Sequence, residues 1–64
     1  MTISTDTTNS QLAGISGDGD DIIVMFPKAQ MSKPEAIRHA AWLAVLADPM
    51  GDEFAAVLEA VRST

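Results

Sequence analysis

The sequence contains no cysteine, no tyrosine and a single histidine. Without cysteine the chain forms no disulfide and no thiolate zinc site, and one histidine cannot build a histidine-rich metal centre. Small domains usually gain extra stability from disulfides, from metals or from oligomerisation. In a chain of 64 residues, which buries only a modest core, self-association is therefore the expected source of additional burial.

Basic residues are also scarce. Four Lys and Arg stand against nine Asp and Glu, which gives a formal net charge of −5. Such a chain repels phosphate backbones at long range, and this weighs against nucleic-acid binding. No stretch approaches the roughly 20 apolar residues of a membrane span. The first residues lack the basic and apolar regions of a signal peptide. We therefore expect a cytoplasmic protein without membrane association.

What the chain does contain is typical of a globular domain. Hydrophobic residues make up 47% of the sequence, and the mean hydropathy is +0.14. Residues 1–10 consist mainly of Thr, Ser, Asn and Asp, which bury too little apolar surface to offset their ordering entropy. We expect a flexible N-terminal tail over residues 1–10 and a single domain over residues 11–64.

A strand is predicted over residues 21–26, which are rich in β-branched and aromatic side chains and are followed by Pro27. Alternation places Ile23 and Met25 on one face and the other apolar side chains on the opposite face, so both faces need cover. Residues 16–21 form a dense turn signal that contains Asp18-Gly19, a pair favoured in tight turns. Residues 11–15 could pair with the strand as a β-hairpin, or the strand could stand alone; the sequence leaves both open.

The three acids of this turn, Asp18, Asp20 and Asp21, raise the question of calcium, which prefers several carboxylates in a short loop. However, no glutamate stands at the spacing that an EF-hand requires, and no helix precedes the loop. A solvated acidic turn is the favoured interpretation. We expect no metal and no other cofactor.

The centre of the chain is a helix predicted over residues 32–47. Ser32 and Glu35 have the spacing of a capping box, and Pro34 suits the first turn. Pro49 disfavours helical geometry at Asp48 and ends the helix there. This helix is apolar nearly all round and should be covered on all sides, which so short a chain can hardly do by itself. A second copy is the simplest cover.

A second helix is predicted from Met50 or Asp52 to Arg62. Its apolar residues recur at helical spacing and should pack inward; they are Met50, Phe54, Val57, Leu58 and Val61. The connection between the helices is short, which predicts an αα-hairpin. The expected fold class is α+β: one strand, or a β-hairpin, followed by an antiparallel two-helix hairpin, in a homodimer.

The candidate interface combines one side of the central helix with the second strand face. The helix contributes Glu35, Arg38, His39, Trp42 and Leu46, and the strand contributes Ile23 and Met25. Aromatic and Arg side chains dominate binding hot spots, which favours an interface at Trp42, although the same indole could pack on the strand as part of the core. Glu35, one turn before His39, could orient its imidazole as a general base. No nucleophile accompanies this pair, so we expect no enzyme activity.

Two segments carry a resemblance to known proteins. Residues 39–48 read H-A-A-W-L-A-V-L-A-D, and residues 54–64 read F-A-A-V-L-E-A-V-R-S-T. Together they resemble a group of small mycobacteriophage proteins with a "HAAWL…LAD" core and a closing "F-x-x-V-L-x-A-V-R-x-T" helix. The resemblance implies a phage product in the host bacterial cytoplasm. It carries no catalytic residues, because the shared positions are helix-packing residues.

The first hypothesis for function is a non-enzymatic protein–protein interaction module that self-associates, binds a host protein, or does both. The alternative is a DNA-binding regulator of the ribbon-helix-helix type, which shares the strand–helix–helix order. In that fold the outward strand face is polar or basic, because it reads base edges in the major groove. An antitoxin-like or inhibitor role would also fit the acidic charge.

Overall fold

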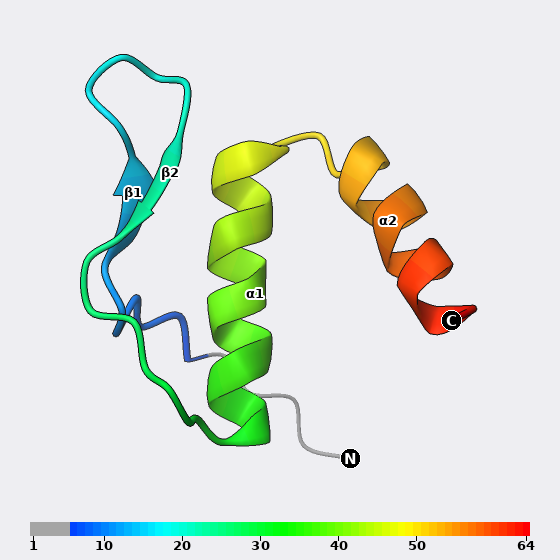
Figure 1. The fold of residues 1–64 in the computed structure, drawn as a ribbon, viewed down its shortest axis with the longest axis horizontal. Coiled ribbons are helices and arrows are strands. Elements are labelled where there is room, and N and C mark those ends of the chain that lie inside the picture. The colour runs from blue at the N-terminus through cyan, green and yellow to red at the C-terminus, as the bar shows by residue number, and fades with distance from the viewer. Residues whose placement is uncertain (1–5) are drawn as a thin grey trace.

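The computed structural model describes residues 6–64. Two short strands, β1 (Ala13–Ile15) and β2 (Ile22–Val24), are followed by helices α1 (Lys33–Ala47) and α2 (Asp52–Arg62). The β-hairpin lies along one side of α1, and α2 descends on its other side after a short connection (Figure 1). The expected α+β order, with two helices after the sheet, is confirmed.

The hairpin settles the question that the sequence left open. β1 and β2 pair antiparallel, with Ala13 opposite Val24 and Ile15 opposite Ile22. The acidic turn joins them: the Ser16 N–H donates to the Asp21 carbonyl at 2.9 Å, and Gly19 takes a positive φ of 82°, which favours glycine. Strand β2 is shorter than the predicted strand over residues 21–26, because the regular pairing with β1 spans only Ile22–Val24.

Gln11 is the most deeply buried side chain among residues 6–64, with only 2% of its surface exposed. Its Oε1 accepts the Lys28 N–H at 2.9 Å, its Nε2 lies 3.6 Å from the Met31 sulfur, and its own carbonyl accepts the Phe26 N–H at 3.1 Å. A buried amide is stable only when its polar atoms are paired, and these bonds meet that requirement. Gln11 therefore ties the chain after β2 to the segment before β1.

Helix α1 begins as the sequence predicts. Ser32 is the N-cap, and its hydroxyl accepts the Glu35 N–H at 3.3 Å. In a full capping box the Glu35 carboxylate would accept the Ser32 N–H. Here this carboxylate pairs with Lys28. At the other end the Asp48 N–H still bonds the Ala44 carbonyl at 2.8 Å, and the helix ends at Ala47.

Helix α2 begins one turn after Pro49, with Gly51 as its N-cap in the left-handed region at φ 82°. Gly51 has no side chain to offer, and the Asp48 carboxylate instead accepts the Phe54 N–H at 2.8 Å. Asp48 is therefore the C-cap of α1 and not the N-cap of α2, but its carboxylate still pairs one of the first N–H groups of α2. The same residue ends one helix and stabilises the start of the next.

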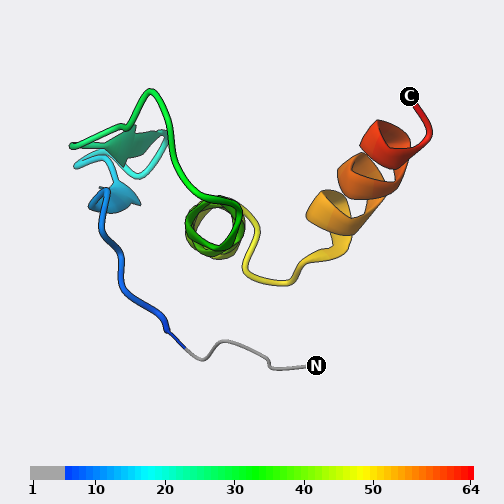
Figure 2. The ribbon, with the colours of Figure 1, turned by 90° about the horizontal axis from the view of Figure 1, so that it is seen from below.

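The expectation that α2 packs inward is wrong. The hairpin contacts α1, whereas α2 has only sparse contact with the other elements. Seen from below, α2 lies apart from α1 and slants away from it (Figure 2). Only Ala13 and Gln11 are buried among the described residues. The helical hairpin is therefore open, because the short connection returns the chain without bringing the two helices into close packing.

Candidate interaction surface

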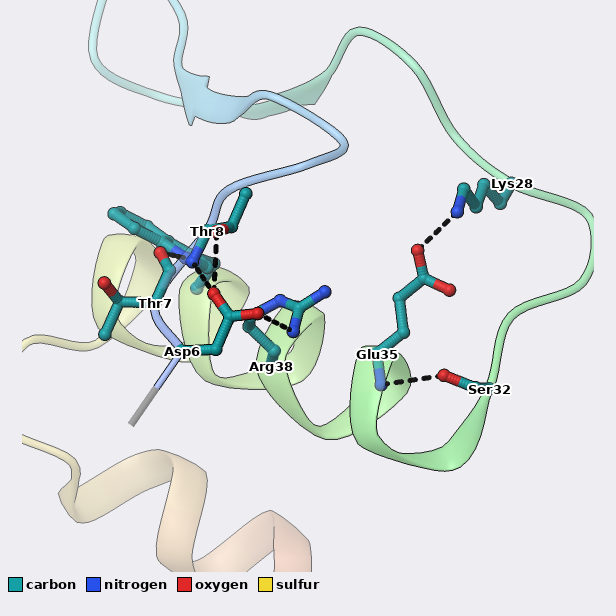
Figure 3. Close-up of polar contacts among 8 residues, drawn as sticks. Asp6, Thr7, Thr8, Lys28, Ser32, Glu35 and Arg38 are labelled. Carbon is teal, nitrogen blue, oxygen red and sulfur yellow. Dashed lines mark hydrogen bonds and ion pairs between the residues drawn. The ribbon is translucent and has the colours of Figure 1, made fainter. Parts of the chain in front are cut away.

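One side of α1 already has polar contacts with the N-terminal part of the chain. Residues 6–8 cross this side of the helix (Figure 3). The Arg38 guanidinium donates to the Asp6 carboxylate at 2.9 Å, and the Trp42 indole N–H donates to the Thr7 carbonyl at 3.0 Å. The tail predicted over residues 1–10 thus has specific contacts with α1 from Asp6 onward, while residues 1–5 lie outside the described part of the chain.

Two carboxylates on this side have lowered pKa values. Hydrogen bonds from the Thr8 hydroxyl and N–H, and to a lesser extent the Arg38 charge, hold the pKa of Asp6 below its ordinary value of 3.8. The hydrogen bond and charge of Lys28 lower the pKa of Glu35 from its ordinary value of 4.5 (Figure 3). Both groups are thus carboxylates at neutral pH and hold the loop and the N-terminal segment against α1.

The candidate residues proposed from the sequence therefore separate into two groups. On α1, Glu35, Arg38 and Trp42 bond within the chain, and His39 and Leu46 are half-buried on the same helix. On the hairpin, Ile23 and Met25 are exposed, Met25 to 64% of its surface. The structure thus bonds Glu35, Arg38 and Trp42 to residues of their own chain, while the strand residues keep an apolar surface exposed to solvent.

A second set of exposed apolar side chains in the described residues lies on α2 and on α1. The α2 stripe comprises Phe54, Val57, Leu58 and Val61, with exposed fractions from 38% at Leu58 to 64% at Val61, and Met50 precedes it at 85%. We call these four helical residues the α2 face. On α1, Ile37 and Val45 are exposed in the same way.

An apolar groove joins the two helices. Ala44, Ala47 and Asp48 line it from α1 and its end, and Glu53, Phe54 and Val57 line it from α2. Its volume is about 260 Å³, and it is open to solvent. The Ala side chains leave room beside the larger Phe54. An apolar side chain from another helix could enter this groove and touch both helices at once.

The sequence predicts the apolar stripe of α2 correctly, but the stripe is exposed instead of packed against the rest of the chain. Sequence reasoning also missed Gln11, whose amide organises the loop, because a polar residue beside a turn signal gives no indication of burial. Asn9 was missed in the same way: its side chain both donates to and accepts from the backbone of Ala13, at 2.9 and 3.0 Å. A local sign was available for Asn9, since such side chains often bond the backbone near turns.

The acidic turn forms no metal-binding cluster. Asp18 accepts hydrogen bonds from the Ser16 hydroxyl and from the Asp20 N–H, which lower its pKa. Within residues 6–64 no three His, Cys, Asp or Glu side chains lie close enough together to hold an ion. Across the same residues, neither helix has the length and apolar character needed to span a bilayer.

Comparison of the chain with protein-family models, with curated proteins and with solved structures gives no match. The most informative property of the chain is the contrast between the bonded inner side of α1 and the uncovered α2 face.

Proposed function

We propose that this protein is a non-enzymatic protein–protein interaction module whose binding surface is the α2 face. The observation that carries the proposal is the exposure of Phe54, Val57, Leu58 and Val61 along one side of a helix that has only sparse contact with its own chain. An isolated helix of 11 residues is marginal in water, so α2 needs cover to remain helical. A protein partner supplies that cover.

The total surface supports the same conclusion. The chain exposes 5293 Å², whereas a compact protein of 6.8 kDa exposes about 4,000 Å². The excess is on the order of 1,000 Å² per chain, comparable with the roughly 800 Å² that each partner contributes to a standard protein interface. The exposed apolar side chains of α2, α1 and the hairpin are part of this surface.

The partner is a second copy, a host protein, or each in turn. A host partner follows from the resemblance to small phage proteins and is part of this proposal. Enzymatic activity is not proposed, because the only imidazole, that of His39, has no nucleophile near it in sequence.

DNA binding has less support than protein binding. In a ribbon-helix-helix dimer each strand pairs with the strand of the other copy, whereas β2 pairs here with β1 of its own chain. The Ile23 and Met25 side chains on the exposed strand region are apolar rather than basic, and the net charge is −5.

The proposal can be tested with a photo-crosslinking amino acid placed at position 58 of the full chain, produced in a mycobacterial cell. Position 56 is the matched control, because Ala56 lies on the opposite side of the same exposed helix. We expect irradiation to give a discrete adduct, of the chain with itself or with one other protein, from position 58 and not from position 56. Equal or absent crosslinking at both positions would overturn the proposal.

A further inference from the structure

We infer that a second copy of this chain covers the α2 face, with the two α2 helices antiparallel about a two-fold axis that passes between Val57 and Leu58. This inference rests on the proposed function and specifies its partner. It begins from the spacing of the α2 face, which is symmetric about its own midpoint. An antiparallel helix related by that axis places Phe54 opposite Val61 of the second copy, and Val57 opposite Leu58.

Side-chain size fits this pairing. The largest residue of the face, Phe54, meets the smaller Val61 at both ends of the contact, so that two aromatic rings do not compete for the same space. Interdigitation of large with small side chains is what close packing between helices requires. A parallel arrangement would instead place Phe54 against itself, and Val61 against itself, at opposite ends.

The charges of α2 favour the same direction. Asp52 and Glu53 lie in the first turn and Arg62 in the last. In an antiparallel pair, the acidic turn of each helix is level with Arg62 of the other copy, and the helix dipoles run in opposite directions. In a parallel pair the two acidic turns would lie side by side and repel each other.

The groove between the helices gives the second copy more to contact than α2 alone. An incoming α2 that pairs with Phe54 and Val57 also reaches Ala44 and Ala47, which line the same groove. Ile37, which lies two turns before Ala44 on the same side of α1, is also exposed. A second copy that contacts both helices buries more apolar surface than one that contacts α2 alone, and stable dimers need about 800 Å² from each partner.

Sedimentation equilibrium of the purified full chain tests the association. We expect a dimer at micromolar concentration, and we expect Leu58→Glu to weaken it by at least about 30-fold, the lower limit for a hot-spot residue. Ala56→Glu adds the same charge on the opposite side of α2 and should leave the dimer intact. Circular dichroism of both variants shows whether helix content is retained.

The absence of cysteine allows a second test that does not depend on a disruptive variant. Val61→Cys mixed with Phe54→Cys should form a disulfide between the two different chains, while each variant alone should form far less. Disulfides within each variant alone would indicate a parallel pair and overturn the inference. A dimer that Leu58→Glu does not weaken would also overturn it, while leaving self-association in place.

The two proposals can fail separately. A purified chain that remains monomeric at high micromolar concentration would overturn the second-copy inference. If position 58 nevertheless crosslinks to another protein in the cell, the interaction module stands and its partner is that protein. If position 58 also gives no specific adduct, both proposals fail.

Discussion

The two helices of this protein differ in how far the rest of the chain covers their surfaces. Helix α1 is apolar nearly all round, yet its inner side is tied to its own chain through Arg38, Trp42 and Glu35. Helix α2 has one clean apolar stripe, and its own chain leaves that stripe uncovered. An amphipathic pattern shows that a face needs cover, but the pattern alone does not show which molecule provides it.

The largest effect expected from within the chain is at Trp42. Trp42→Ala removes the packing of a half-buried indole and its bond to the Thr7 carbonyl, and should lower the free energy of unfolding by about 2–3 kcal/mol, somewhat less than for a fully buried Trp. Urea denaturation followed by circular dichroism measures it. Trp42→Phe keeps a ring and should lose about 1 kcal/mol. Equal losses in both variants would mean that the hydrogen bond, not packing, holds α1.

A smaller effect is expected at Asp48, and it should be confined to α2. Asp48→Ala removes the acceptor of the Phe54 N–H and should cost about 1 kcal/mol of local stability, seen as faster hydrogen exchange of the first α2 amides. The end of α1 should be unaffected, because the Asp48 N–H still bonds the Ala44 carbonyl. Asp52→Ala is the matched control: it removes the same charge near the same helix end, and should cost less than half as much.

The smallest expected effect is that of acid on the segments held against α1. Asp6 and Glu35 have lowered pKa values in the folded protein, so their stabilising contribution is complete above their ordinary pKa values, near 4, and is lost as the pH falls through the lower folded values. The urea midpoint should therefore decline as the pH falls below the ordinary pKa values of 3.8 and 4.5. The Asp6→Asn variant should show a shallower decline. A midpoint independent of pH in this range would show that these pairs contribute nothing measurable.

The local elements were readable from the sequence for identifiable reasons. Ser32 before Pro34 marks the start of α1, Pro49 marks its end, and the Asp-Gly pair marks the turn. The sequence does not decide between a hairpin and a single strand, because residues 11–15 carry few strand-forming side chains. Strand β1 forms because Ile22–Val24 offers an edge with which it can pair. Periodic and capping signals act over a few residues, and these parts of the fold depend on such short distances.

The arrangement of the elements could not be read in the same way. The side of α1 around Trp42 was proposed as an interface, with core packing as the alternative; the structure shows its N–H bonded to Thr7, 35 residues earlier in the chain. The α2 face was expected inside because its stripe is clean. A chain of 64 residues can bury only some of its apolar surfaces. Which of them are buried depends on the packing of the whole molecule, and a local sequence pattern does not contain that information.

The amide at position 11 has a consequence for recognising relatives of this protein. Hydrophobic positions can exchange Leu for Met or Ile at a small cost in stability, so the residues at these positions change quickly between distant homologues. A side chain that must receive the N–H of Lys28 while offering hydrogen to the sulfur of Met31 has almost no substitutes. Sequence similarity should therefore persist longest at two polar residues ahead of the hairpin, Asn9 and Gln11, rather than in the two helices.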